Sequence, residues 1–320
     1  MTRDPFVVVD WGSSRLRLWL ADDDPEIEVS EYACDRGIGT VGPGDHEAVF
    51  CETLAELFRG AKISIPCLDV YFSGMITSTL GWVPTPYLEL PVRLGDLRRG
   101  ERVERRPSPS PPELVLHFFP GVRSRDDGMR GEEIEVFGCL PDGDDRGSSV
   151  SVVVLPGTHS KWIRCEGARI VDFVTVPSGD VHAALHRESL LARTLPEAPA
   201  PIRGNLWNCF DRGVRSARDK GPLSSLFQVR ALAVLEDSAL TKEECSAFLS
   251  GVLIGGEICE RLPGVGEDEP VIVGGAAALQ ELYLRALGTL TSGKRKFDAV
   301  PTTGEPTVIR AIRQLRMERG

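Results

Sequence analysis

The stretch FVVVDWGSSRLRLWLAD, residues 6–22, decides the fold. Its first part, FVVVD, is a short β-branched run with almost no alternation of polarity, which is typical of a strand buried on both faces. After the turn at residues 11–14, Arg15, Arg17 and Trp19 alternate with leucines, and this period of two predicts a second strand. Two strands around a tight Gly/Ser turn predict a β-hairpin rather than a strand–loop–helix unit.

The turn of this hairpin has residues that can hold a phosphate and a metal ion. Asp10 ends the buried strand, and Gly12 allows a ligand to approach the backbone closely. Ser13 and Ser14 offer hydroxyls and amides to a phosphate, and the Asp10 carboxylate can hold Mg²⁺ directly or through water. A hairpin turn without any ligand is the alternative interpretation.

A similar pattern recurs in SVVVLPGTHSKWIRC, residues 151–165, which predicts a buried strand, a polar turn and another strand. Such a turn can form a nest of backbone amides around phosphate oxygens. Lys161 can add positive charge or be a solvated surface lysine, and His159 can contact a nucleotide or pack. The residues of this predicted phosphate turn are Gly157, Thr158, His159, Ser160 and Lys161.

A third glycine turn, Gly274-Gly275, follows the apolar run VIV and precedes a predicted helix. Paired glycines allow a flat adenosine to lie against the backbone beside a helix N-terminus. A plain strand–helix turn is the alternative.

Acidic residues gather in MRGEE, residues 129–133, where a helix is predicted to begin near Glu132. A carboxylate there can accept the proton of a hydroxyl that attacks a γ-phosphate, and the helix N-terminus favours its ionised form. Alternatively, the two glutamates merely suit the helix dipole. We favour Glu132 as the general base, with Glu133 as the second choice.

The rest of the chain predicts two α/β domains, residues 1–145 and 150–320, separated by the Gly/Asp/Ser-rich linker at 141–149. Residues 100–112 are predicted to form a surface loop because four prolines follow one another closely. Gly251 and Gly255, four residues apart on a predicted helix, indicate close helix packing. Further helices are predicted at 45–59, 129–140, 180–193, 245–262 and after residue 275, and strands at 68–74 and 168–177.

Composition excludes several function classes. The 320 residues carry a net charge of −10, so the chain has no electrostatic footprint for nucleic acid or an anionic membrane. The eight cysteines form no CxxC pair, which indicates reduced cysteines in a cytoplasmic protein. No apolar run approaches the ~18 residues that a membrane span needs. The Walker, dinucleotide-binding and protein-kinase signatures are missing.

Read together, VVDWGSSRLRLWL, FSGMITSTLGW, GMRGEEIEVFG, LPGTHSKW, FVTVPSGD, FLSGVLIGGEI and VIVGGAAAL resemble the 2-dehydro-3-deoxygalactonokinase family, of the actin, hexokinase and Hsp70-like superfamily. The resemblance implies two actin-like (ribonuclease H-like) α/β domains with a nucleotide cleft between them. It implies ATP- and Mg²⁺-dependent phosphorylation of the terminal (6-) hydroxyl of 2-dehydro-3-deoxy-D-galactonate in galactonate catabolism.

The implied acceptor is a carboxylate, which an acidic chain must bind with local cations or amides. We predict Arg17, Arg130 and the segment Ser73, Gly74 and Met75 for this role, since an arginine fork matches a carboxylate. Two alternatives stay open: a kinase of the same fold for 2-dehydro-3-deoxygluconate or an amino sugar, and a non-catalytic ATP-binding regulator. A homodimer is also left open.

Overall fold

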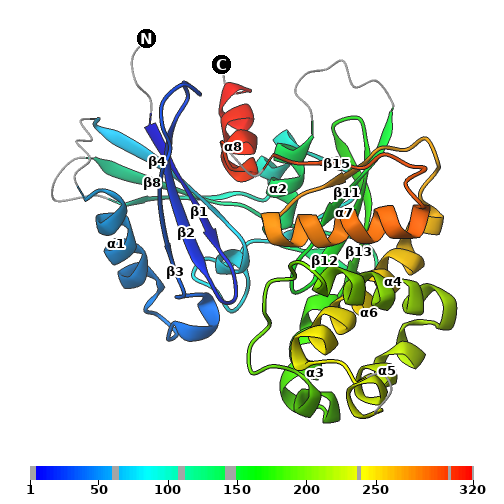
Figure 1. Cartoon of the computed structure of the whole chain (residues 1–320). Helices are drawn as coiled ribbons and strands as arrows, with labels where there is room; N and C mark the ends of the chain where they lie inside the picture. Colours follow the sequence, from blue (N-terminus) through cyan, green and yellow to red (C-terminus); the bar gives the residue numbers. More distant parts are fainter. Residues whose placement is uncertain are drawn as a thin grey trace. The chain divides into compact units, whose positions relative to one another are not determined.

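We describe a computed structural model of the chain, covering residues 5–59, 65–106, 112–140, 149–235, 239–301 and 304–318 (Figure 1). The residues divide into two compact units. Unit 1 comprises the described parts of Met1–Ser148, Glu166–Asp172 and Thr303–Gly320, and unit 2 those of Ser149–Cys165 and Phe173–Thr302. The predicted division at residues 145–150 stays a prediction, although the C-terminal residues group with unit 1.

Unit 1 is built on a six-stranded sheet in the order β3-β2-β1-β4-β8-β7. The predicted hairpin is confirmed: β1 (Pro5–Trp11) and β2 (Leu16–Asp22) are antiparallel, with Asp10 opposite Arg17. β4 (Cys67–Ser73) lies parallel to β1 and brings Ser73 beside Asp10. The carboxyl ends of β1 and β4 therefore meet at one edge of the sheet.

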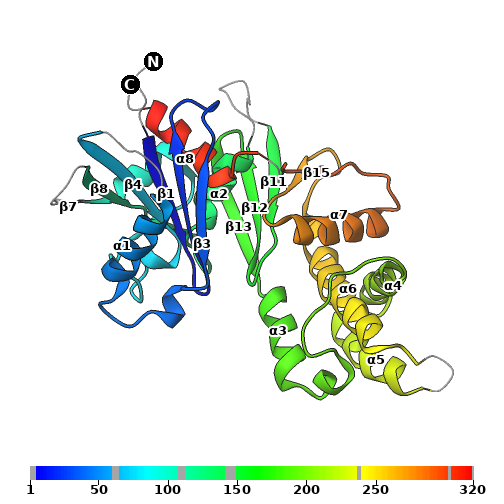
Figure 2. The ribbon, with the colours of Figure 1, turned by 60° about the vertical axis from the view of Figure 1, so that its left-hand side comes forward.

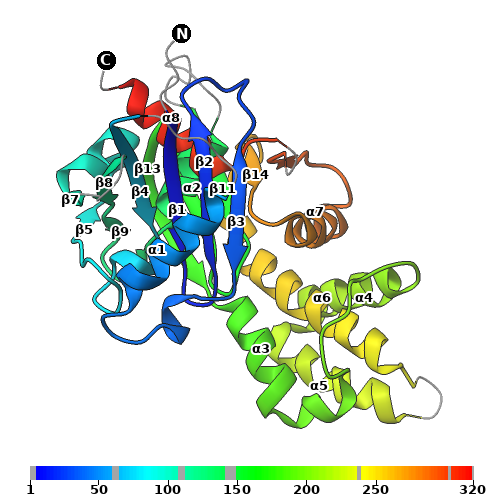
Figure 3. The same cartoon turned by 90° about the vertical axis from the view of Figure 1, so that its left-hand side faces the viewer.

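Helices pack on the sheet of unit 1. Val7, Val9 and Trp11 of β1 pack in one core with residues of α1 (His46–Leu57), which lies over the strands in Figure 3. On the other face, Arg316 of α8 (Thr307–Met317) lies 4.8 Å from the centre of the Phe6 ring. Burial of β1 on both faces agrees with its unbroken apolar run.

The predicted helix at 129–140 is confirmed as α2 (Glu132–Cys139). It packs closely against α8. A Cβ atom added at Gly138 would lie only 1.8 Å from the carbonyl oxygen of Thr307, so only a glycine fits there. This close packing explains why the C-terminal helix belongs to unit 1.

The prediction of a surface loop over 100–112 is wrong for its first half. Arg102–Arg106 form the edge strand β7, antiparallel to β8 (Glu113–Phe118). The prolines begin only at residue 107, so they leave the preceding backbone free to pair. Residues 107–111 and most of the predicted linker, residues 141–148, lie outside the described residues.

The sheet of unit 2 contains β15, β14, β11, β12 and the Phe173–Val176 part of β13, in this order. The predicted strand–turn–strand is confirmed as β11 (Val150–Leu155) and β12 (Ser160–Glu166), followed by β13 (Arg169–Val176). β14 (Val271–Val273) is parallel to β11 and leads through the Gly274-Gly275 turn into α7 (Ala277–Thr291).

Four helices, α3 to α6, gather at one end of the unit 2 strands (Figure 2). The predicted close packing of α6 is confirmed, because a Cβ at Gly251 would lie 2.1 Å from the carbonyl oxygen of Phe210, and a Cβ at Gly255 would lie 2.8 Å from Cα of Val214. Both partners belong to α4. These helices are α3 (Ser178–Glu188), α4 (Leu206–Lys220), α5 (Pro222–Val234) and α6 (Lys242–Arg261).

Within the described part of the chain, no helix combines the length and the apolar character required to span a membrane.

The remaining elements are short. The remaining strands are β3 (Ser30–Cys34), β5 (Tyr87–Glu89), β6 (Val92–Arg93), β9 (Gly121–Arg123), β10 (Gly128–Met129) and β15 (Asp298–Ala299), and the 3₁₀ helices are η1 (Ile38–Thr40), η2 (Met75–Thr77), η3 (Leu94–Arg99), η5 (Leu190–Thr194) and η7 (Leu262–Gly264).

Candidate active site

Asp10, at the carboxyl end of β1, is paired with Arg17 across the hairpin. The Arg17 Nε and Nη2 atoms lie 3.1 and 2.5 Å from Oδ2 of Asp10. The sequence predicted separate roles for these residues, a metal ligand and a cation for the acceptor, but the structure joins them. The Asp10 side chain keeps 21% of its surface exposed, so a ligand can reach this carboxylate.

Gly74 is the point where the predicted site residues of unit 1 meet. It follows β4 with φ = 93°, and a Cβ atom there would lie 2.8 Å from the carbonyl oxygen of Trp11 and 3.3 Å from Oδ1 of Asp10. On its other side lies Gly131, whose Cβ would be 3.0 Å from the Gly74 Cα. The structure therefore brings Asp10, the 73–75 segment and the acidic turn together, although 120 residues separate the first from the last.

The two glutamates of the acidic turn differ in environment. Glu133 is only 1% exposed and accepts the Gly131 amide with both carboxylate oxygens, at 2.9 and 2.8 Å. Burial, with the nearby charge of Glu132, raises the pKa of Glu133 to about 8. Glu132 is half-buried and accepts the Arg130 amide at 3.0 Å. Of the two, Glu132 is the carboxylate that a substrate can reach.

Arg130, a predicted contact for the acceptor carboxylate, lies buried within unit 1. Its guanidinium is buried and donates to the carbonyl and hydroxyl oxygens of Thr77 at 2.7 and 2.8 Å, and to Thr85 Oγ1 at 2.7 Å. It also lies 4.2 Å from the centre of the Tyr87 ring. These contacts engage the guanidinium in holding the segment after Gly74, so its predicted contact with a substrate carboxylate has no support in this geometry.

The first predicted phosphate turn is open to ligands. Ser13 and Ser14 are exposed, while the Gly12 amide donates to the Arg15 carbonyl at 3.0 Å and closes the hairpin. The Ser13 carbonyl accepts the Gly39 amide, which fixes the backbone of the turn. A fixed backbone with exposed hydroxyls suits phosphate oxygens.

The start of α3 packs against the backbone of the second predicted turn, in unit 2. A Cβ atom at Gly179 would lie 2.4 Å from the Gly157 carbonyl oxygen, and the Asp180 amide donates to the Thr158 carbonyl at 2.9 Å. Thr158 and His159 are exposed. The beginning of α3 thus supports the turn, which leaves its tip accessible.

Two members of this turn point inward. Lys161 is 4% exposed, so the solvated-lysine interpretation is wrong. The Ser160 hydroxyl lies 2.8 Å from Tyr283 Oη and 3.2 Å from Ser178 Oγ. Ser160 therefore belongs to a buried network rather than to the exposed tip of the turn.

The centre of that network is Glu257 of α6, which sequence analysis missed. It is 3% exposed and accepts from Trp162 Nε1 at 2.8 Å, from Tyr283 Oη at 2.7 Å and from Ser178 Oγ. Burial raises its pKa, and these donors partly offset the effect. The signal available in the sequence was a single acidic residue within the apolar helical run GVLIGGEIC.

The third predicted turn lies beside the second one. The Gly274 amide donates to the Val154 carbonyl at 2.8 Å. Gly275 has φ = 80°, and a Cβ there would lie 3.4 Å from the Pro156 carbonyl oxygen. The adenosine and phosphate turns predicted in unit 2 are thus neighbours, as one nucleotide would require.

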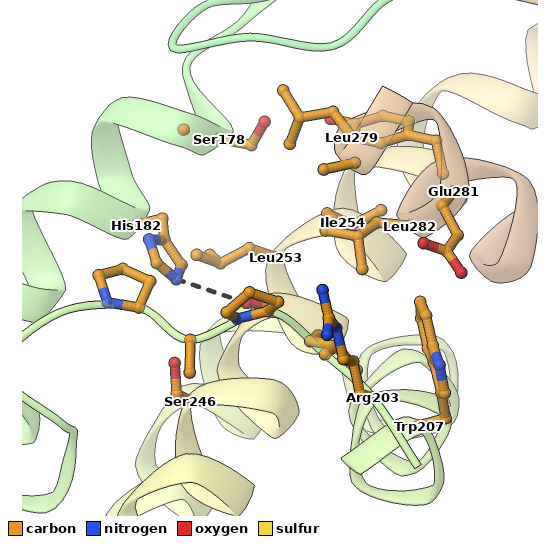
Figure 4. Close-up of a pocket in the computed structure, with 18 of the residues that line it drawn as sticks. Ser178, His182, Arg203, Trp207, Ser246, Leu253, Ile254, Leu279, Glu281 and Leu282 are labelled. Atoms are coloured by element: carbon orange, nitrogen blue, oxygen red, sulfur yellow. Dashed lines mark hydrogen bonds between the residues drawn. The ribbon is translucent and has the colours of Figure 1, made fainter. Parts of the chain in front are cut away.

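A cavity of about 810 Å³ begins at Gly157 of the phosphate turn and continues between α3, α4, α6 and α7. Its phosphate-turn end is formed by Gly157, Ser178 and Gly179, and its other walls include Trp207, Ile254 and Leu282 (Figure 4). The dashed line from His182 in Figure 4 is its 3.4 Å contact with Ser250 Oγ. The volume suits a small molecule with a flat apolar part.

Trp207 packs between Arg285 and Phe210 in its wall of the cavity. Arg285 lies 4.8 Å from the centre of the Trp207 ring and forms two 2.8 Å hydrogen bonds to Asp211. Phe210 meets the same indole edge-on at 5.6 Å. A fixed indole can stack on a nucleobase.

The topology and the paired glycine turns define the class of this protein: it has the α/β fold of the actin-like ATPases and sugar kinases. A crystal structure from Sinorhizobium meliloti, described as a candidate 2-dehydro-3-deoxygalactonokinase, has this fold with a TM-score of 0.78 and 27% sequence identity, covering 98% of this chain and 99% of that one.

The 2-keto-3-deoxy-galactonokinase family model matches residues 10–306, and the chain belongs to this family of kinases. The resemblance seen in the sequence is thereby confirmed. "Probable 2-dehydro-3-deoxygalactonokinase DgoK1" of Rhizobium meliloti (strain 1021) is 30% identical over 300 residues, 92% of each chain. The 2-dehydro-3-deoxygalactonokinase of Escherichia coli (strain K12) is 30% identical over 286 residues, 88% of each chain.

Proposed function

We propose that the chain transfers the γ-phosphoryl group of ATP to the terminal hydroxyl of 2-dehydro-3-deoxy-D-galactonate. The observation that carries this proposal is the meeting of Asp10, Gly74 and the Glu132 turn within unit 1. It supplies a carboxylate for the metal ion, a backbone turn against which the acceptor can lie, and a base. The names of the relatives supply the acceptor.

Glu132 is the proposed general base. Its carboxylate is half-buried, next to the turn at Gly74. It would accept the proton of the terminal hydroxyl as the hydroxyl oxygen attacks the γ-phosphorus. Glu133, with its raised pKa and its bonds to Gly131, would hold the turn instead of touching substrate.

The residues around Asp10 fit Mg²⁺, because they offer an exposed carboxylate and the hydroxyls of Ser13 and Ser14, and magnesium prefers oxygen ligands. Bound Mg²⁺ would neutralise charge that develops on the phosphoryl oxygens. We propose that Arg17 exchanges from Asp10 to the anionic acceptor or phosphate when substrates bind, which frees the Asp10 carboxylate. Arginine suits this exchange because its fork matches either anion.

In unit 2, the phosphates of the nucleotide would contact the turn at 157–159, and its adenosine would enter the cavity that Gly157 lines. The adjacent Gly274-Gly275 turn is held against β11 by the bond from the Gly274 amide to the Val154 carbonyl. In unit 1, the turn at 12–14 would offer its hydroxyls and amides to phosphate oxygens.

The test is ADP release from the purified chain with Mg²⁺–ATP and one of three acceptors: 2-dehydro-3-deoxygalactonate, 2-dehydro-3-deoxygluconate or N-acetylglucosamine. We expect turnover with the first, and a decrease of about 10²–10³-fold in kcat for Asp10→Asn, since an electrostatic contact to the transition state is lost. Glu52→Gln, an exposed carboxylate paired with Arg36, is the matched control and should be unchanged. Turnover confined to another acceptor would contradict the proposed substrate. Binding of ATP without turnover of any acceptor would contradict the proposed kinase activity.

A further inference from the structure

The hydrogen bonds around Glu257 fix the direction in which the neighbouring hydroxyls point. Trp162 Nε1 can only donate, so it occupies Oε1 of Glu257 as a donor. Ser178 and Tyr283 both donate to Oε2. Three donors converge on one carboxylate, an arrangement that suits its acceptor-only form.

This arrangement commits the protons of three hydroxyl groups. Because Tyr283 gives its proton to Glu257, the 2.8 Å contact between Tyr283 and Ser160 takes its proton from Ser160. Ser178 also gives its only hydroxyl proton to Glu257. The oxygen of Ser178 can therefore only accept further hydrogen bonds.

Ser178 is the member of this network that a ligand can reach. It is half-buried and lines the cavity next to Gly157 and Gly179, whereas Tyr283 is 2% exposed. Figure 4 shows Ser178 on the wall opposite the Trp207 side of the cavity. An acceptor at this place selects a ligand group that donates.

The parts of a nucleotide differ in what they offer. Phosphate oxygens accept hydrogen bonds and would meet the lone pairs of Ser178 unfavourably. The base suits the apolar walls at Trp207, Ile254 and Leu282. The ribose lies between phosphates and base and has hydroxyl donors, so it suits the wall between the glycine turn and the apolar end.

We propose that Ser178 is a specificity-determining residue that accepts a hydrogen bond from a ribose hydroxyl of the nucleotide, and that Glu257 is the positioning residue that holds Ser178 as an acceptor. This inference rests on the proposed use of ATP. It deepens that proposal because it makes the site selective for ribonucleotides over deoxyribonucleotides.

The test compares ATP, 2′-deoxy-ATP and 3′-deoxy-ATP as phosphoryl donors and, by calorimetry, as ligands. For the unmodified chain we expect kcat/KM about tenfold lower with at least one deoxy analogue, which is the fold-change for one lost hydrogen bond. Ser178→Ala should lower kcat/KM for ATP to the level of that analogue and bring the ratio near one. Ser178→Thr keeps a hydroxyl and should retain the discrimination.

Glu257→Gln tests the positioning role, because its amide donates to Ser178 and turns the hydroxyl toward donating. We expect the ATP/deoxy ratio to fall toward one, whereas a merely structural defect would weaken all three nucleotides equally. Should this variant fail to fold, the comparison of Ser178→Ala with Ser178→Thr still tests the role of Ser178. Equal use of the three nucleotides by the unmodified chain, or discrimination retained in Ser178→Ala, would overturn this inference. No binding of ATP at all would overturn the proposed function instead.

Discussion

Two carboxylate clusters of this protein, around Asp10 in unit 1 and around Glu257 in unit 2, differ in burial and in the charge of their partners. Asp10 is partly exposed and paired with an arginine, so its charge is balanced yet available. Glu257 is buried, and the side chains of Trp162, Ser178 and Tyr283 that donate to it are neutral. The first arrangement suits exchange of partners with a charged ligand, and the second suits a fixed geometry that supports a turn.

The largest expected effect is a decrease in kcat, and it should differ between variants of Glu132 and Glu133 in unit 1. Glu132→Gln should lower kcat by about 10²–10⁴-fold, because a general base contributes on this scale. Glu133→Gln should lower kcat by less than about tenfold, since its amide oxygen can still accept from Gly131 and one such bond is worth about 1.5 kcal/mol at most. Steady-state ADP release measures both. The reverse order of effects would assign the base to Glu133.

The second prediction breaks the junction at Gly74 without removing any charge. Gly131→Ala places a side chain at φ = 111° and a Cβ 3.0 Å from the Gly74 Cα. We expect the free energy of unfolding to fall by about 1–3 kcal/mol, with a loss of activity because the acidic turn shifts. Urea unfolding and ADP release would measure the two effects.

Gly128→Ala is the matched control for this change. Its Cβ would lie 3.5 Å from Tyr87 Cε1, an ordinary contact, and its φ is not positive. Equal losses in the two variants would show that the special conformation of Gly131 does not matter.

The third prediction acts on the unit 2 cluster. Tyr283→Phe removes a donor from buried Glu257 and a partner from Ser160. We expect the free energy of unfolding to fall by about 1–3 kcal/mol, the usual consequence of an unsatisfied buried group. Tyr87→Phe, at an exposed tyrosine, should change it little. A Tyr283→Phe protein as stable as the unmodified chain would argue against a fully used hydrogen-bond network around Glu257.

The smallest expected effect is on the pH dependence of the free energy of unfolding, through His117, which lies outside both carboxylate clusters. His117 lies 2.5 Å from Glu101 Oε1 and 3.0 Å from Asp69 Oδ1. Burial opposes the charged ring, but these two hydrogen bonds outweigh it and raise the pKa of His117. Its stabilising contribution is thus complete below its ordinary pKa of about 6.5 and is lost as the pH rises through the higher folded-state value.

Urea unfolding between pH 6 and 9 measures this effect. His117→Asn should flatten the decrease in the free energy of unfolding over this range. An unchanged pH dependence in the variant would show that His117 is not the group responsible. In acid the same cluster behaves oppositely: the pKa of Asp69, which burial would raise but hydrogen bonds to His117 and the charge of Arg316 lower, is about 2, so its contribution is lost only as the pH falls through that value.

Local patterns were sufficient for much of the fold. The hairpin of β1 and β2, helix α2 beginning at Glu132 and the close packing at Gly251 all followed from period, turn residues and small side chains. The edge strand β7 was missed because nearby prolines outweighed the backbone pairing of Arg102–Arg106 with β8. The two strands are consecutive in the chain, and the prolines of the connection between them concealed their pairing.

The sequence by itself determined which groups are available: the three glycine turns, the MRGEE carboxylates and the arginines. Only the tertiary structure decided their partners. It paired Arg17 with Asp10, buried Arg130 against Thr77, and separated Glu132 from Glu133 by burial. It also made Glu257 a centre of hydrogen bonds. The physical reason is that burial, and pairings such as that of Arg130 with Thr77, depend on residues far apart in the chain, whereas sequence patterns report on near neighbours.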